Sequence, residues 1–154
     1  MNAKRVLPLA LLYAADSYRI RGRTRFQKLA FLAEQRLEDE GISAYDFIPY
    51  DYGPFTDDLY IELEFLRDKG LVEESRTRTY GGDERYDYKL TREGRQTFEQ
   101  NIPEEPSSPA ENRFETLTEV ANDVVSEYNS IPISNLLKYV YEEYPEYAEN
   151  SVLY

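Results

Sequence analysis

Residues 26–72, FQKLAFLAEQRLEDEGISAYDFIPYDYGPFTDDLYIELEFLRDKGLV, contain the pattern that decides the fold. The first part predicts a helix, because its apolar residues recur at the spacing that places them on one helical face. These residues are Phe26, Leu29, Ala30, Ala33 and Leu37. Thr24 is a suitable N-cap for this helix, and Gly41 is a suitable residue to end it. Gln27 and Lys28 lie off the stripe, so they face either a partner or solvent.

The second part of the stretch predicts a turn followed by another helix. Residues 45–52 alternate aromatic and polar side chains, which indicates a short strand or an extended link, and Gly53-Pro54 then turns the chain. Thr56 can cap the next helix, whose first turn is acidic, as the helix dipole favours. The apolar face of that helix consists of Leu59, Leu63 and Leu66.

The segments on either side complete the pattern of a winged-helix domain. The predicted elements are a helix over residues 3–17, a basic loop over 18–23, strands over 71–80 and 85–90, and a short helix over 91–100. Gly81-Gly82-Asp83-Glu84 between the two strands is a hairpin signal. We therefore expect an α+β fold: a winged helix-turn-helix domain over residues 1–102, with three helices and a β-hairpin wing.

Composition changes after residue 102. Residues 103–109 contain three prolines in seven positions, which is typical of a linker. Residues 110–154 predict a C-terminal helical extension, with an apolar stripe from Phe114 to Tyr128 and a shorter one from Leu136 to Tyr144. The longer stripe is too extensive to leave in water. It either packs back on the domain or contacts a second copy, and we expect a homodimer.

The charge balance predicts a salt-adapted protein, such as those of halophilic archaea. The chain has 30 acidic and 18 basic residues among 154, a net charge of −12, and Arg outnumbers Lys 13 to 5. In molar salt the Debye length falls to about 3 Å, so repulsion between surface carboxylates is screened. The alternative is an ordinary acidic protein from a low-salt environment.

Several classes of function are disfavoured by what the sequence lacks. Without Cys or His there are no disulfides, no thiol chemistry and none of the usual zinc sites. The apolar run over residues 6–15 is too short for a membrane span and contains Pro8. No Gly-rich phosphate loop or nucleophile elbow is present. We expect a cytoplasmic protein that does not contact membranes, is not an enzyme, and has no catalytic residues, cofactor or metal site.

Charge is distributed unevenly along the chain. Residues 1–36 hold eight basic and two acidic residues, net +6, whereas residues 37–75 hold two basic and twelve acidic residues, net −10. Residues 76–100 carry +1 and residues 101–154 carry −9. The basic segment is either a binding surface for an anion or a solvated loop that pairs with the acidic remainder.

Three segments carry a resemblance to a known family. They are residues 26–32 (FQKLAFL), residues 45–55 (YDFIPYDYGPF) and Leu59-Tyr60. In these segments the chain resembles the YwgA-like family of prokaryotic winged-helix proteins. More distantly, it resembles the Panacea antitoxin domain, which shares a Gln-Lys-Leu helix and a Tyr-Gly-Pro turn. The resemblance covers residues 3–100 and implies either a helix-turn-helix regulator or a toxin-neutralising partner.

The first functional hypothesis is a transcriptional regulator that binds double-stranded DNA. Its phosphate contacts would come from the basic loop and the wing, through Arg19, Arg21, Arg23, Arg25, Lys28, Arg76, Arg78 and Arg85. Tyr80 and Tyr86 are candidates for sugar or backbone contacts. The helix after Thr56 carries five acids and is opposed by phosphate repulsion, so we expect it to contribute little.

The second hypothesis is a protein-interaction module, antitoxin-like or adaptor, with no DNA binding. It is favoured by that acidic helix and by the 15 tyrosines, because Tyr combines a large contact area with a polar tip. The tyrosine-rich tail contains Tyr139, Tyr141, Tyr144, Tyr147 and Tyr154. Ordinary core packing is the alternative explanation of this tail.

Overall fold

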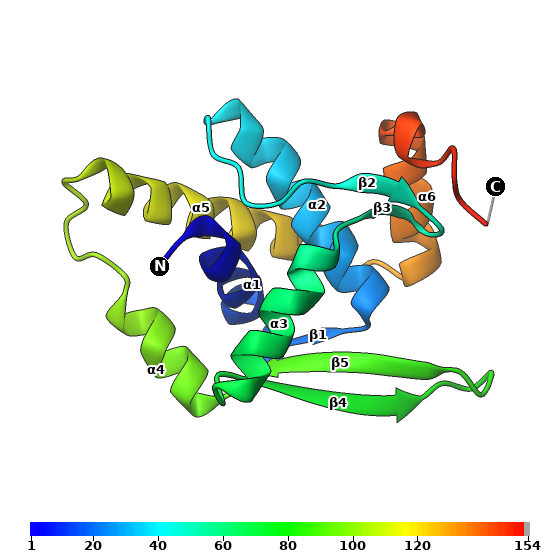
Figure 1. Ribbon diagram of the computed structural model, residues 1–154, viewed down its shortest axis with the longest axis horizontal. Helices are drawn as coiled ribbons and strands as arrows, with labels where there is room; N and C mark the ends of the chain where they lie inside the picture. The colour runs from blue at the N-terminus through cyan, green and yellow to red at the C-terminus, as the bar shows by residue number, and fades with distance from the viewer. Residues whose placement is uncertain (153–154) are drawn as a thin grey trace.

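The computed structural model describes residues 1–152, and Tyr154 lies outside the described residues. The chain forms a mixed α+β fold (Figure 1). Its helices are α1 (Ala3–Ala14), α2 (Arg23–Asp39), α3 (Asp57–Asp68), α4 (Arg92–Gln100), α5 (Pro109–Tyr128) and α6 (Ile133–Glu143). Its strands are β1 (Arg19–Arg21), β2 (Ile48–Tyr50), β3 (Gly53–Phe55), β4 (Val72–Arg78) and β5 (Glu84–Leu90).

Two antiparallel sheets are present in the described part of the chain. The larger has the strand order β1-β5-β4, and the smaller is the β2–β3 hairpin. Figure 1 shows α1, α2 and α3 on one side of the larger sheet, with the β4–β5 hairpin extending beyond them. The predicted hairpin strands at 71–80 and 85–90 are confirmed to within two residues.

Strand β1 corrects the expectation of a basic loop over residues 18–23. Residues 19–21 pair with β5, with Ile20 opposite Tyr88, and the Ile20 side chain is fully buried. Burial of this one side chain fixes the register, so the flanking Arg19 and Arg21 point to the other face. Helix α1 ends at Ala14 rather than at residue 17 because Ala15 is extended, with φ of −77° and ψ of 149°. Ser17 and Tyr18, both with φ of +56°, then form a left-handed turn before the strand.

The C-terminal helices share one hydrophobic core with the N-terminal part. Helix α5 packs against α1 and α2, and its buried residues are Leu117, Ala121, Val124 and Val125. Of the two arrangements left open by the sequence, packing back on the domain is therefore the one observed for α5. The division into a winged-helix domain, a linker and an extension stays a prediction.

Three buried polar side chains of α2 form hydrogen bonds with the backbone of the segment that joins α2 to α3. The Gln27 amide donates to the Thr56 carbonyl (2.8 Å) and accepts from the Thr56 N–H (3.0 Å), as a paired strand would. Lys28 Nζ donates to the Pro54 carbonyl at 2.9 Å. The Glu34 carboxylate accepts from the Ala44 N–H at 3.0 Å. The sequence suggested that Gln27 and Lys28 face a partner or solvent. This expectation was wrong, because both side chains bind the backbone of this chain.

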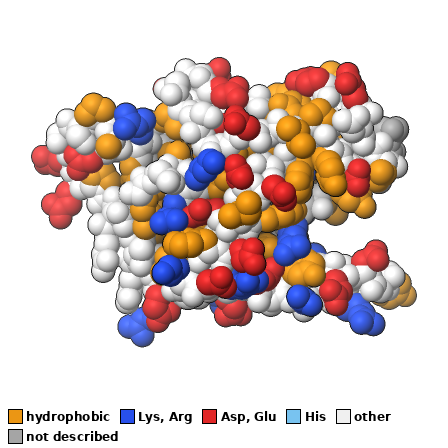
Figure 2. Space-filling model, in the orientation of Figure 1, with side chains coloured by type: hydrophobic (Ala, Val, Ile, Leu, Met, Phe, Trp, Pro, Cys, Tyr) orange, Lys and Arg blue, Asp and Glu red, His pale blue; other side chains and the backbone are white. Residues whose placement is uncertain are grey.

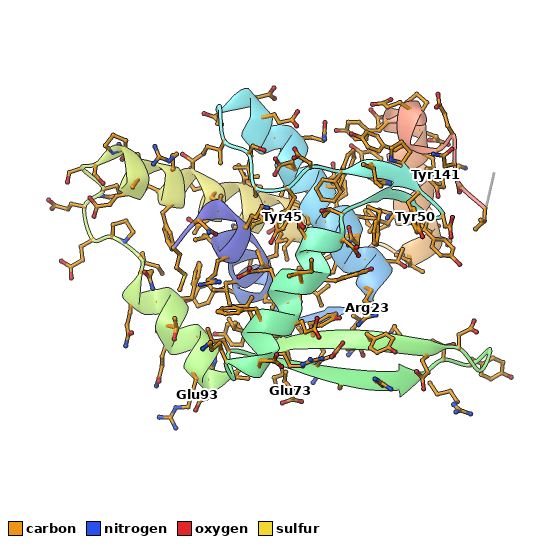
Figure 3. All side chains as sticks on the ribbon, in the orientation of Figure 1. Arg23, Tyr45, Tyr50, Glu73, Glu93 and Tyr141 are labelled. Carbon is orange, nitrogen blue, oxygen red and sulfur yellow. The ribbon has the colours of Figure 1, made fainter. Side chains whose placement is uncertain are left out.

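The turn at Gly53 is closely packed against α6. Gly53 has φ of +95°, and a Cβ there would lie 2.8 Å from Cε1 of Tyr141. Tyr141 and Tyr50 lie at the same end of the β2–β3 hairpin (Figure 3). Glycine is thus required both by the backbone conformation and by the ring above it.

Alanine substitution separates these two requirements. Gly41 has φ of +72°, and a Cβ at this position would meet no atom within 4 Å, so Gly41→Ala carries only the backbone penalty, about 1 kcal/mol. Gly53→Ala adds overpacking, worth about 1–3 kcal/mol, and should lower the free energy of unfolding by more than Gly41→Ala in urea denaturation. Equal losses would contradict the contact with Tyr141.

Candidate functional site

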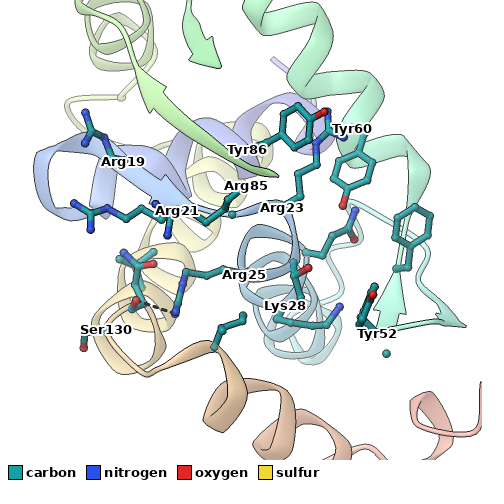
Figure 4. Close-up of a pocket in the computed structure, with 18 of the residues that line it drawn as sticks. Arg19, Arg21, Arg23, Arg25, Lys28, Tyr52, Tyr60, Arg85, Tyr86 and Ser130 are labelled. Atoms are coloured by element: carbon teal, nitrogen blue, oxygen red, sulfur yellow. Dashed lines mark hydrogen bonds between the residues drawn. The ribbon is translucent and has the colours of Figure 1, made fainter. Parts of the chain in front are cut away.

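A cleft of about 1040 Å³ lies where the N-terminus of α2 meets both sheets. Its lining comes from β1, the first turns of α2, β5, the β2–β3 hairpin, α3, and the segment that joins α5 to α6. Figure 4 shows Arg19, Arg21 and Arg25 on one side of this cleft and Tyr52 and Tyr60 on the other. The cleft therefore has a cationic side and an aromatic side.

Six of the eight predicted phosphate-binding residues line this cleft. They are Arg19, Arg21, Arg23, Arg25, Lys28 and Arg85. Arg76 lies outside the lining but places its guanidinium 5.2 Å from the ring of Tyr86, which does line it. Arg78 lies opposite Glu84 in the register of β4 and β5, near the end of the hairpin. Three acidic residues also line the cleft: Asp16, Asp51 and Glu84.

Two of the six cations are bound to carboxylates. Arg23 donates to Glu74 at 3.1 Å and to the Tyr88 hydroxyl at 2.9 Å. Burial works against the charge, yet these hydrogen bonds raise the pKa of Arg23. Arg85 donates to Asp87 at 2.8 and 3.0 Å. Both side chains have structural roles, so their charges are compensated within the chain.

Arg19, Arg21 and Arg25 have no carboxylate partner within residues 1–152. Arg19 and Arg21 are exposed, and Arg25 is half-buried with a 3.0 Å hydrogen bond to the Asn129 carbonyl. Burial and the nearby Arg85 guanidinium lower the pKa of Arg25. An anion in the cleft would relieve this repulsion between like charges.

Lys28 lies at the back of the cleft and is almost fully enclosed. Its exposed fraction is 2%, and its single hydrogen bond described above is to a neutral carbonyl. Burial lowers the pKa of Lys28 from 10.5 to about 7. Because it is enclosed, Lys28 is poorly placed to touch a phosphate directly.

The aromatic side was not anticipated from the sequence, apart from Tyr86. The Arg23 guanidinium lies 3.8 Å from the ring of Tyr86 and 5.0 Å from that of Tyr60. The ring of Tyr60 contacts that of Phe55, with centroids 5.5 Å apart, and the ring of Phe55 contacts that of Tyr50, with centroids 4.9 Å apart. These residues come from four elements, and only the Tyr-Gly-Pro-Phe turn hinted at part of the set. Tyr80, the other predicted contact, is fully exposed in the β4–β5 turn, outside the cleft lining.

Residues 1–152 contain neither a metal-binding cluster nor a membrane-spanning helix. No group of three or more acidic, His or Cys side chains in this range is placed so that it could hold a metal ion. None of the helices in the same range combines the length and apolar character needed to cross a bilayer.

Replacing Lys28 with Met should change how stability depends on pH. Between about pH 7 and 10.5 the unfolded chain holds the Lys28 proton and the folded chain does not, so the wild-type free energy of unfolding rises with pH. One such proton contributes up to about 1.4 kcal/mol per pH unit. Urea denaturation at several pH values should show that Lys28→Met lacks this rise, whereas Lys69→Met, at an exposed position, keeps it. Parallel curves for wild type and Lys28→Met would refute the buried, weakly basic amine.

Comparisons with known proteins give no match: no protein-family model fits the chain, and no curated protein sequence is similar to it. The resemblance to the YwgA-like family therefore stays a prediction.

Proposed function

We propose that this chain is a nucleic-acid-binding protein of the winged-helix type, a transcriptional regulator or related factor that binds double-stranded DNA. The order α1-β1-α2-β2-β3-α3-β4-β5, in which β1 completes a three-stranded sheet with β4 and β5, supports the winged-helix assignment. A fold alone does not define a function, so the proposal depends on the cleft.

The observation that carries the proposal is that several arginines without a carboxylate partner line one side of the cleft. Arg19, Arg21 and Arg25 lie together in a chain whose net charge is −12. Elsewhere, acidic and basic side chains are interspersed, as the face in Figure 2 shows, and pairs such as Arg5 with Glu62 compensate each other. A concave cationic site concentrates positive potential, and phosphate binding there releases condensed counterions.

Helix α3 is not the element that we assign to the nucleic acid. It carries five acidic residues and only one base, Arg67, which is itself bound to Glu74 at 2.6 Å. Phosphate repulsion therefore disfavours placing α3 in a groove. The hairpin extends the cationic surface instead, through Arg76 and Arg78, so the duplex would lie across the cleft and the hairpin.

Loss of the two exposed arginines should weaken DNA binding. The variant Arg19→Gln/Arg21→Gln is preferable to any change at Arg23, which holds Glu74 in the fold. Fluorescence anisotropy with a duplex should show lower affinity and a slope of log K against log salt that is shallower by about 2. The matched control is Arg92→Gln/Arg113→Gln, which removes two exposed charges outside the cleft lining. Equal affinity for both variants would rule out the cleft as the DNA site.

A second candidate, a protein-interaction module, is favoured by one surface of α3. Ile61 is 61% exposed and Phe65 lies nearby on the same helix, among the acidic residues. The tyrosine-rich tail gives less support than its composition suggested, because Tyr144 and Tyr147 pack on Phe31 with ring centroids 4.9 and 4.7 Å apart.

This second candidate predicts a partner that depends on Ile61. Affinity capture from a host lysate at native salt should retain a stoichiometric partner with the wild type and lose it with Ile61→Asp. Ile102→Asp, at a position 45% exposed after α4, should retain it. Retention by both variants would exclude α3 as the docking surface.

A further inference from the structure

We propose that the cleft binds a nucleoside phosphate, with the phosphate at Arg19, Arg21 and Arg25 and the base against the aromatic side. The inference rests on the proposed function and names the chemical group that enters the cleft. A free nucleotide and the end of a nucleic-acid strand both present this group.

The size of the cleft points to a small group rather than a duplex. Its volume of about 1040 Å³ is just above the range of about 300–1,000 Å³ typical of small-molecule sites, and corresponds to a space about 10 Å on an edge. A duplex, whose major groove alone is about 12 Å wide, can cover such an opening but cannot enter it. What fits inside is one or two nucleotides.

The cationic side has the chemistry that a phosphate group requires. Arg19 and Arg21 are neighbours on one face of β1, since residues two apart on a strand point the same way. Arg25 lines the same side of the cleft from the first turn of α2, with its guanidinium directed toward the Asn129 carbonyl (Figure 4). That turn begins at Gly22 without a capping side chain, so the helix dipole adds to the field of the three guanidinium groups.

The aromatic side offers ring faces for a base. Tyr50 and Tyr52 are each 49% exposed, although both line the cleft. Behind them, Phe55 stacks on Tyr50 with an interplanar angle of 27°, which keeps the Tyr50 ring in a defined orientation. Exposed aromatic rings beside a cationic groove are the combination by which proteins hold unpaired nucleotides.

Side-chain contacts connect the two sides of the cleft. Arg23, held by Glu74, lies between the rings of Tyr60 and Tyr86. A Cβ at Gly53 would lie 3.6 Å from Cε of Lys28, so the turn over residues 50–53, here called the tyrosine turn, packs on α2. The spacing between cations and rings is therefore set by the fold, as a site for a ligand with two distinct ends requires.

Isothermal titration calorimetry with three probes tests the inference: adenosine 5′-monophosphate, inorganic phosphate and adenosine. The nucleotide should bind wild type more tightly than either of the other two. Arg21→Gln should weaken nucleotide and phosphate alike. Tyr50→Leu should weaken the nucleotide about tenfold and leave phosphate within about twofold, because only the base stacks. Tyr80→Leu, at the fully exposed hairpin tip, should change neither.

Two outcomes would overturn the inference. One is a nucleotide that binds no more tightly than phosphate, including no binding of either. The other is a Tyr50→Leu variant that weakens both probes equally. If Tyr50→Leu does not fold, Tyr52→Leu gives the same comparison from the same turn.

Oligonucleotides distinguish the source of the ligand and separate this inference from the proposed function. Preferred binding of a 5′-phosphorylated single strand over the free nucleotide assigns the site to strand ends, and the reverse assigns it to free nucleotides. Nucleotide binding without duplex binding supports the inference and refutes the DNA proposal. A third outcome is that a duplex binds through Arg19 and Arg21 while neither a nucleotide nor a single strand binds. This outcome refutes the nucleoside phosphate site but leaves the DNA proposal standing.

Discussion

The paired hydrogen bonds between the Gln27 amide and the Thr56 backbone are the contact on which the site depends. They join α2 to the start of α3 as if the side chain were a short strand, and they are buried, where leaving either group unpaired costs about 1–3 kcal/mol. The tyrosine turn is fixed beside the first turn of α2 by this contact and by Lys28. Without it, Tyr50 and Phe55 would no longer be held beside the cationic side of the cleft.

The burial of Lys28 has a cost in folding free energy. A buried amine opposes the folded state whenever it is charged, and its hydrogen bond to Pro54 offsets only part of that penalty. The fold tolerates this because a neutral lysine still donates a hydrogen bond. An anion bound in the cleft would raise the pKa of Lys28 and so couple ligand binding to protonation.

Local patterns predicted most of the helices and the long hairpin, since apolar periodicity and turn residues are local signals. The Thr91 cap of α4, for example, is confirmed by a 2.9 Å hydrogen bond from the Gly94 N–H. Strand β1 was missed because three residues, Arg-Ile-Arg, give no periodic signal, and their partner strand lies more than 60 residues away. The expected cap at Thr24 was wrong for a related reason: Gly22, held by the Tyr86 carbonyl, starts α2 earlier.

The candidate site was predictable only in part. The charge excess of residues 1–36 identified the basic residues, but not which of them the fold neutralises. Glu74 binds both Arg23 and Arg67, although it follows one by 51 residues and the other by only 7, and no sequence rule selects it. The aromatic side depends on the same long-range contacts. Its members come from β2, β3, α3 and β5, so it exists only once the chain is folded.

The location of these cations also bears on the salt adaptation that the composition predicts. In molar salt a Debye length of about 3 Å removes most of the attraction between an open helix face and a phosphate backbone. Groups inside a concave, partly desolvated cleft are screened less, because ions cannot fill the space between them and the ligand. A protein that must hold an anion under those conditions gains from enclosing Arg25 and from directing contact away from α3. Repulsion by the acidic remainder of the chain would then help to confine the proposed anion binding to this cleft.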